Sequence, residues 1–165
     1  MSGIGNGLFA PKMTTTRAQM AQMLYQLAGA PAVSGKTPFT DLTQAWYQNA
    51  VLWAYQTGVA TGTGATTFSP DAAVTREQVA VMLMSYARRI AQVDLSGAKA
   101  DLSKFPDGAR VSSWARTDLS AAVALGLISG VRDGGTVYLS PQGSAAREQV
   151  ATILMAFSRN VLHRA

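Results

Sequence analysis

The stretch VTREQV at residues 74–79 decides how this chain folds, because related stretches occur at two other places. The counterparts are TTRAQM at residues 15–20 and AAREQV at residues 145–150. An apolar residue stands eight positions before each arginine, and a proline follows two positions after it, as in Phe9 and Pro11, Phe68 and Pro70, and Leu139 and Pro141. Such recurrence indicates an array of similar supersecondary pieces, so we expect the three arginines to have related roles.

Two of the three units are complete. Each opens with Phe-x-Asp, at residues 39–41 and 105–107, and continues with Trp46 or Trp114. From tryptophan to arginine is 30 residues in the second unit and 33 in the third, and the extra residues lie in a loop at 131–135. The first unit has only its second half, so we expect Met1 to begin a fragment of a longer chain. We place the units at 1–30, 38–93 and 104–163 of a single module spanning 1–165.

Apolar residues after each arginine follow the three-to-four spacing of one buried helical face. After Arg76 they are Val79, Met82, Leu83, Tyr86 and Ile90, and the other two stretches repeat the pattern. Shorter helices are expected at 45–57 and 112–125, each ended by a glycine, Gly58 or Gly126, that can adopt the left-handed conformation. Turn-rich loops join the helices of a unit, with a short extended piece around Phe68. The sequence therefore predicts five helices, and a sixth that would open the first unit is missing.

The starts of the long helices carry capping signals. Thr75 and Gln78 fit a capping box, in which the hydroxyl accepts from the third helical amide and the glutamine reaches back. The first unit has the same pair, Thr16 and Gln19. In the third unit Ala146 replaces the threonine, a loss of about 1 kcal/mol.

Composition limits the classes of partner. The chain has 165 residues, is 48% hydrophobic and contains no cysteine, which predicts one core and excludes disulfides and thiolate metal sites. The formal charge of +5 favours anionic partners, among them nucleic acid, anionic lipid and anionic polysaccharide. No apolar run approaches the roughly 20 residues of a membrane-spanning helix.

Catalysis has little support in this sequence. The only histidine, His163, stands third from the C-terminus, and no histidine-centred triad can be built at a sheltered place. Glu77 and Glu148 lie in first helical turns, where stabilising the helix dipole is the simpler role. Gly3-x-Gly5-x-Gly7 matches a phosphate loop only weakly, without the strand or lysine that such loops need. We therefore expect no enzyme, no cofactor and no metal site.

The second unit resembles an S-layer homology repeat. The residues that carry the resemblance are Phe39-x-Asp41, Trp46, Ala54, Gly58-Val59, Gly62, Phe68-x-Pro70 and residues 74–78. The resemblance implies an all-α fold in which three repeats form one pseudo-threefold helical bundle. It also implies that grooves between repeats bind pyruvylated secondary cell wall polysaccharide of Gram-positive bacteria. Such a module is secreted and tethers a longer exported protein to the cell surface without catalysis.

The residues themselves offer chemistry for an anionic sugar. Arg17, Arg76 and Arg147 are the expected carboxylate ligands, because a guanidinium pairs with a carboxylate through two hydrogen bonds. Each stands in a first helical turn, where backbone N–H groups also favour an anion. Trp46 and Trp114 offer flat faces to the sugar ring.

Further candidates surround these side chains. Gly62 and Gly130 would let the loop backbone approach a ligand. Asp41 and Asp107 are expected to orient an arginine or cap a helix. Thr75 and Gln78 complete the candidate ligand-binding set, with helix capping as their alternative role.

Structural alternatives stand beside these roles. The arginines can instead form salt bridges to an aspartate of a neighbouring repeat, and the tryptophans can pack in the core. The whole chain is then an assembly module, which completes its half repeat through an unpaired apolar face by forming a homo-oligomer. A nucleic-acid-binding domain is disfavoured, because the arginines are spread one per repeat rather than clustered with lysines.

Overall fold

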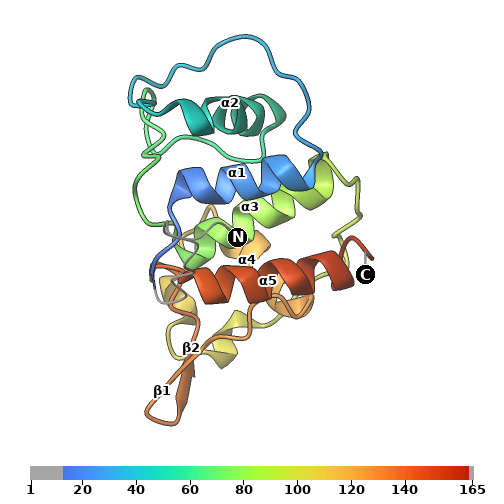
Figure 1. Cartoon of the computed structure of the whole chain (residues 1–165). Coiled ribbons are helices and arrows are strands. Elements are labelled where there is room, and N and C mark those ends of the chain that lie inside the picture. The colour runs from blue at the N-terminus through green and yellow to red at the C-terminus, as the bar shows by residue number, and fades with distance from the viewer. Residues whose placement is uncertain (1–12, 164–165) are drawn as a thin grey trace.

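The computed structural model describes residues 13–163 and is mostly helical (Figure 1). Phe9, Pro11 and the glycines at 3, 5 and 7 lie outside this range. The α-helices are α1 (Arg17–Leu27), α2 (Gln48–Thr57), α3 (Arg76–Arg89), α4 (Arg116–Ala124) and α5 (Arg147–Asn160). Single turns of 3-10 helix lie at Ala45–Tyr47, Leu102–Lys104 and Gly108–Arg110. None of the helices within residues 13–163 is long and apolar enough to cross a membrane.

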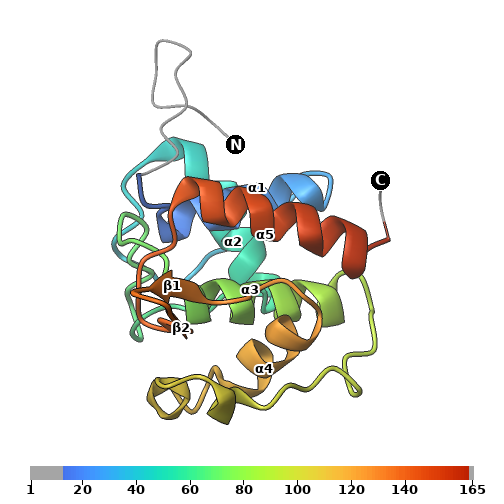
Figure 2. The same ribbon diagram turned by 90° about the horizontal axis from the view of Figure 1, so that it is seen from below.

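The three long helices, α1, α3 and α5, each begin at the arginine of a repeat and run side by side (Figures 1 and 2). The short helices α2 and α4 pack on them from outside. Trp53 of α2 lies between Tyr25 of α1 and Tyr86 of α3, with ring centroids 5.6 and 6.3 Å away. Tyr86 in turn meets Phe157 of α5 edge to face at 5.9 Å. Aromatic rings therefore link the three long helices through the core.

The expected helices are present at the expected places. α2 follows a 3-10 turn within the expected 45–57 segment, whereas α4 begins only at Arg116 because a turn occupies residues 113–115. Gly58 and Gly126 have φ of +78° and +75°, which confirms their role as left-handed helix ends. Both capping boxes also form, with the Thr75 hydroxyl accepting from the Gln78 amide at 3.2 Å and the Gln78 side chain accepting from the Thr75 amide at 2.9 Å.

The expectation of an all-α fold fails in one segment. The extra residues of the third repeat form an antiparallel hairpin of β1 (Val131–Asp133) and β2 (Thr136–Tyr138), which projects from the bundle (Figure 1). Gly134 and Gly135 turn the chain with φ of +58° and +86°, angles that glycine adopts at little cost. The extended piece expected near Phe68 amounts to single bridges, such as Thr16 with Ala73.

A closed ring of backbone hydrogen bonds joins the three repeats. The Thr15 amide donates to the Ala145 carbonyl at 2.9 Å, Ala145 to Val74 at 3.0 Å, and Val74 back to Thr15 at 2.8 Å. Each of these residues stands two positions before its repeat's arginine, and all three are fully buried. The ring joins each repeat to the next through the same position of the sequence motif, so a contact seen in one repeat can be compared with its counterpart in the next.

Candidate functional site

The first turns of α1 and α3 have no free amides for an anion. The Arg17 amide donates to the Ala72 carbonyl at 2.9 Å, and the Ala18 amide to the Pro70 carbonyl at 3.0 Å. The Thr16 hydroxyl accepts from the next free amide, that of Gln19. At α3 the loop of the third repeat supplies the same acceptors, through Gly143 and Pro141. The backbone part of the expected anion attraction is therefore wrong for these two helices, whose N-termini instead hold the following repeat.

The Arg17 side chain fastens the first repeat to the second. It is only 5% exposed, and its Nε and Nη2 donate to the carbonyls of Phe68 and Thr61 at 2.8 and 2.7 Å. Its guanidinium carbon lies 4.7 Å from the centroid of the Phe68 ring. Burial lowers the pKa of Arg17 below its ordinary value, and the nearby Asp41 offsets only part of this change. The contacts are those of an inter-repeat clamp, with carbonyls in the place that we expected a carboxylate to take.

Arg76 is held far less tightly. Its Nη1 makes one long hydrogen bond, 3.3 Å, to the Ser144 carbonyl of the third repeat. The side chain is half-buried, and burial lowers its pKa. Arg147 is as buried as Arg17, at 5% exposure, and lines a groove described below.

Asp41 and Asp107 hold loops rather than arginines or helix ends. The two carboxylate oxygens of Asp41 accept from the amides of Phe68 and Ser69 at 3.0 and 2.9 Å. Burial acts to raise the pKa of Asp41, but these amides and Arg17 outweigh it, and the pKa lies below its ordinary value. Asp107 accepts in the same way from the amides of Leu139 and Ser140. Sequence reasoning missed this role, which keeps each loop closed over the phenylalanine that precedes the aspartate.

Gly62 and Gly130 are required by the protein itself. A Cβ on Gly62 would stand 2.4 Å from the Thr67 carbonyl oxygen and 2.5 Å from the Phe39 ring. A Cβ on Gly130 would stand 2.5 Å from a Val137 methyl, and φ there is +98°. Both glycines therefore allow the loop to close on itself, whether or not a ligand approaches them.

Trp46 and Trp114 lie at the surface. Their exposed fractions are 51% and 59%, so the alternative in which they pack in the core is wrong. The core residues are their neighbours, Tyr47 and Ala115, both fully buried. The Tyr47 hydroxyl accepts from the Thr43 amide at 2.9 Å, which fixes the 3-10 turn with Trp46 facing outward. An exposed indole at the same position of two repeats suits a binding role better than a packing role.

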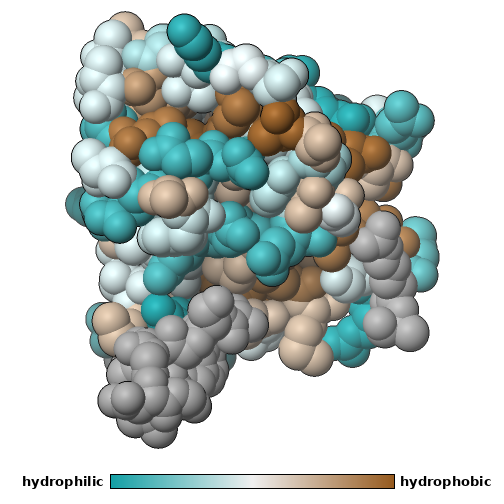
Figure 3. Space-filling view, turned by 45° about the horizontal axis from the view of Figure 1, so that its top comes forward, coloured by the Kyte–Doolittle hydropathy of each residue, from teal (hydrophilic) through white to brown (hydrophobic). Residues whose placement is uncertain are grey.

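A groove with a volume of about 830 Å³ lies between α1 and α5. Its walls are residues of the two helices together with Trp46: Gln19, Gln22, Met23, Gln26 and Leu27 from α1, and Arg147, Ala151, Leu154, Met155 and Ser158 from α5. Gln19 and Arg147 stand in the first turns of α1 and α5, and Trp46 comes from the 3-10 turn before α2. The rest of the groove is largely apolar. Figure 3 shows, on one face of the molecule, several hydrophobic areas that reach the surface between hydrophilic ones.

A smaller hollow of about 430 Å³ lies beside the hairpin of the third repeat. Arg110, Asp133 and Tyr138 are among its lining residues. The second repeat has no hairpin, so this hollow has no counterpart there. Among residues 13–163, no three acidic or histidine side chains gather to hold a metal ion.

Comparison with known proteins identifies relatives of this chain. The sequence pattern of the S-layer homology domain matches residues 1–21, 38–80 and 104–151. The chain is 32% identical over 162 residues to the surface-layer 125 kDa protein of Lysinibacillus sphaericus, covering 98% of this chain and 13% of that protein. It is 29% identical over 171 residues to a cellulosome-anchoring protein of Acetivibrio thermocellus, covering all of this chain and 37% of that protein.

Some relatives bear the names of enzymes, but the shared part is small. The amylopullulanase of Thermoanaerobacterium thermosulfurigenes is 28% identical over 93% of this chain, which is only 8% of that protein. The chain therefore spans a minor part of the length of these relatives. A solved structure, an undecaheme cytochrome from the S-layer of Carboxydothermus ferrireducens, aligns with a TM-score of 0.45 and 22% identity over 90% of this chain and 22% of its own.

Proposed function

Because this chain belongs to the S-layer homology domain family, we propose that it is a non-catalytic module anchoring a longer exported protein to the cell wall. Its ligand in this proposal is the pyruvylated secondary cell wall polysaccharide of Gram-positive bacteria. Support comes from relatives named as surface-layer, cell-surface and cellulosome-anchoring proteins. Their names also place the module at the cell surface.

The observation that carries the proposal is that a half-exposed tryptophan and an arginine, Trp46 and Arg147, line one groove between repeats. A pyruvate ketal adds a carboxylate to a sugar, and an arginine holds such a group through paired hydrogen bonds. The indole face covers the C–H surface of a sugar ring. Gln19, at the same end of the groove, adds an amide for hydroxyl groups.

Arg76 and Trp114 are a second pair of candidate ligand-binding residues. Glu77, the residue after Arg76, accepts from the Ser112 hydroxyl at 2.6 Å and the Ser112 amide at 3.0 Å. This contact fixes the segment bearing Trp114 at the start of α3. Arg76 is also the most exposed of the three arginines, so it has the most freedom to meet a ligand.

The remaining candidate residues hold the loops and the helix start around these two pairs of side chains. Arg17 and Asp41 hold the loop that contains Gly62, and Asp107 holds the loop that contains Gly130. Thr75 and Gln78 fix the start of α3, next to Arg76. We therefore expect substitutions at these positions to weaken binding through the fold.

Co-sedimentation with Gram-positive cell wall sacculi tests the proposal, run beside sacculi stripped of their secondary polysaccharide. The protein should pellet only with intact walls. Trp46→Ala and Arg76→Ala should each weaken pelleting about tenfold, equivalent to about 1.4 kcal/mol. Tyr55→Ala is the matched control, because Tyr55 is an aromatic residue of similar exposure, 41%, outside the groove. Equal pelleting with stripped walls would contradict polysaccharide binding.

An assembly module is the second candidate function. It is favoured by Arg17, whose hydrogen bonds all go to the next repeat, and by the use of the helix N-termini to bind neighbouring loops. In that case the repeat motifs serve inter-repeat packing, and the open groove serves a homo-oligomer. A folded protein that stays in the supernatant with intact walls would favour this function.

A further inference from the structure

The third repeat is longer than the second at two places, and both extra segments line the hollow of about 430 Å³ beside the hairpin. From the aspartate of Phe-x-Asp to the tryptophan, the second repeat spans 41–46 and the third spans 107–114, which is two residues longer. The other extra segment is the β1–β2 hairpin. Arg110 comes from the first of these segments and Asp133 from the second. The hollow is therefore a feature of the third repeat that the second repeat cannot form.

One face of the hairpin makes a wall of the hollow. Val131 pairs with Tyr138 in the antiparallel register, and Asp133 stands two positions after Val131, so the three side chains share a face. All three line the hollow. Arg132, between them, belongs to the opposite face and is not part of the lining. The other lining residues are Pro106, Asp107, Arg110 and Ser140.

The corresponding loop of the second repeat pairs its own hydroxyl groups. The Thr63 hydroxyl oxygen lies 2.6 Å from that of Ser69 and 3.2 Å from that of Thr67. Counted from the glycine before the loop and the apolar residue after it, the equivalent residues of the third repeat are Val131, Ser140 and Tyr138. Valine has no hydroxyl, and within residues 13–163 the Ser140 hydroxyl has no hydrogen-bond partner. A closed set of hydroxyl groups in one repeat is thus replaced by an open hollow in the next.

Arg110 and Asp133 bring opposite charges to this hollow without pairing. Both side chains are exposed, and in the part of the chain that the structure describes neither has an ion pair or a side-chain hydrogen bond. The guanidinium offers donors and the carboxylate offers acceptors. Tyr138 is half-buried and adds an aromatic ring. Donors, acceptors and a ring, with the two charges balanced, suit a neutral ligand that carries several hydroxyl groups.

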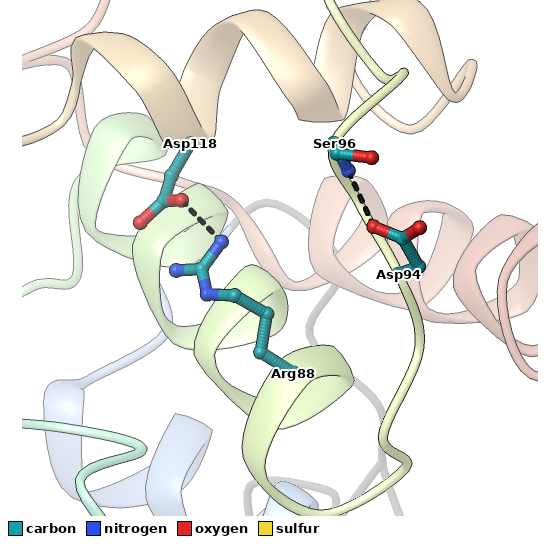
Figure 4. Close-up of polar contacts among 4 residues, drawn as sticks. All are labelled: Arg88, Asp94, Ser96 and Asp118. Carbon is teal, nitrogen blue, oxygen red and sulfur yellow. Dashed lines mark hydrogen bonds and ion pairs between the residues drawn. The ribbon is translucent and has the colours of Figure 1, made fainter.

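The Arg110 side of the hollow is fixed to the bundle. The Gln142 side-chain amide donates to the Arg110 carbonyl at 2.8 Å and to the Glu77 carboxylate at 3.2 Å. The helix that follows, α4, is held on α3 by an ion pair of 2.9 Å between Arg88 and Asp118 (Figure 4). Because this wall is held in place by the protein, a ligand bound against it has a smaller ordering cost.

We propose that the hollow binds one neutral pyranose unit. The C–H face of the sugar ring lies on Tyr138, its hydroxyl groups donate to the Asp133 carboxylate, and Arg110 donates to the hydroxyl oxygens. The Ser140 hydroxyl is a further partner, since it lines the hollow. The volume of about 430 Å³ lies within the range of roughly 300–1,000 Å³ that small-molecule sites have.

This inference rests on the proposed function for the source of the sugar, which is a neutral unit of the same wall polysaccharide. The hollow and Arg76 meet one turn of the chain. Ser140 lines the hollow, its carbonyl accepts from the Gly143 amide at 3.0 Å, and Arg76 donates to the Ser144 carbonyl in the same turn. A polymer that crosses this turn can place an anionic unit at Arg76 and a neutral unit in the hollow.

The test is a titration of the isotope-labelled full chain with glucose, N-acetylglucosamine and glucuronate, followed by amide NMR. A neutral sugar should shift the amides of residues 131–140 saturably. Tyr138→Ala should lower its affinity about tenfold, whereas Tyr138→Phe should preserve it because the ring remains. Glucuronate should bind more weakly than glucose, since its carboxylate would meet Asp133.

Asp133→Asn reverses that preference in this proposal. It should weaken glucose binding about fivefold, because a charged acceptor is lost, and should strengthen glucuronate binding. Arg132→Gln is the matched control, because it removes a charge from the opposite face of the same strand. In the absence of sugar, unchanged amide signals of Gly134 and Gly135 would show that the hairpin stays folded in every variant.

No saturable shift with either neutral sugar would overturn the proposal. Equal affinities of the wild type, Tyr138→Ala and Asp133→Asn would also overturn it, as would tighter binding of glucuronate than of glucose.

Co-sedimentation with intact cell wall sacculi tests the source of the sugar. Asp133→Asn should pellet less than Arg132→Gln. Equal pelleting of the two variants, with sugar binding intact in the titration, would overturn the assignment of the hollow to the wall polysaccharide. A wild-type protein that stays in the supernatant while neutral sugars still shift the hairpin amides would contradict the proposed wall anchoring and leave the pyranose site standing.

Discussion

Arg17 and Arg76 occupy the same position of two repeats, yet their surroundings differ. Arg17 is 5% exposed, donates two hydrogen bonds of 2.8 and 2.7 Å to carbonyls and lies over the Phe68 ring. Arg76 is half-buried and makes a single bond of 3.3 Å, to Ser144. The same residue therefore acts as a clamp at one interface and leaves most of its donors available at the other.

The loops that receive the two arginines explain this difference. The loop beneath Arg17 places the carbonyls of Thr61 and Phe68 toward one guanidinium. In the third repeat the equivalent loop contains the β1–β2 hairpin, and Arg76 meets only the segment after it, at Ser144. A change of three residues in a loop thus alters what an unchanged arginine of the preceding repeat can do.

The largest expected effect is the loss of Arg17. Arg17→Ala removes two hydrogen bonds from a charged donor and leaves the Phe68 carbonyl buried without that partner. We expect the free energy of unfolding to fall by about 3 kcal/mol, against less than about 1 kcal/mol for Arg76→Ala. Urea unfolding followed by circular dichroism measures both. Equal losses would show that the two arginines do the same work despite their different contacts.

Arg17→Lys refines that experiment, because it keeps the charge but loses the planar fork that reaches two carbonyls at once. Its stability should lie between those of the wild type and Arg17→Ala. A lysine variant as stable as the wild type would mean that charge alone holds the interface.

The second largest change in the free energy of unfolding is expected at Asp41, because its carboxylate holds the loop that Arg17 binds. Its folded-state pKa lies below the ordinary value of 3.8, so its contribution to stability is fully present above that pH and is lost as the pH falls through the folded-state pKa. Asp41→Asn should lower the free energy of unfolding at pH 7 by about 2 kcal/mol and should reduce its decline below pH 4.

Urea unfolding at a series of pH values checks this prediction, with Asp71→Asn, at an exposed position of the following turn, as the control. An acid decline as steep in Asp41→Asn as in the wild type would assign the acid sensitivity to other carboxylates. Asp94 and Asp101, whose pKa values are also lowered by hydrogen bonds that they accept from the serines two positions later, would then be the next to test.

Sequence patterns predicted the parts of this fold that depend on neighbouring residues. The face of α3 follows from the spacing of Val79, Leu83 and Tyr86, and the capping box joins residues only three apart, Thr75 and Gln78. The hairpin also had a local signal, since Asp133, Gly134 and Gly135 lie between alternating residues that suit a tight turn. We interpreted this segment as a loop, and that interpretation was wrong.

Other parts depend on contacts that no local pattern encodes. Asp41 accepts from amides 27 and 28 residues away, and the ring of Thr15, Val74 and Ala145 uses backbone groups alone. Trp46 and Tyr47 are neighbours of similar character, and only the 3-10 turn decides that the tyrosine faces inward. The candidate groove is likewise formed by helices 130 positions apart in sequence, so its residues were predicted separately but not as a group.

The smallest expected change in the free energy of unfolding comes from the helix caps at the starts of α3 and α5. The backbone at Ala146, with φ −74° and ψ 157°, matches that of the capping Thr75, with φ −89° and ψ 162°. Gln149 already accepts from the Ala146 amide at 2.9 Å, so only the hydroxyl is missing. Ala146→Thr should therefore raise the free energy of unfolding by about 1 kcal/mol, and Thr75→Ala should lower it by a similar amount.

Thermal unfolding of the two single variants and their combination measures this pair, and the double variant should resemble the wild type because the two caps lie on different helices. Ala146 also bridges to Thr14 of the first repeat, which is a β-branched neighbour. A destabilised Ala146→Thr would mean that Thr14 crowds the new side chain, so that the alanine at this helix start serves the contact between the third and first repeats.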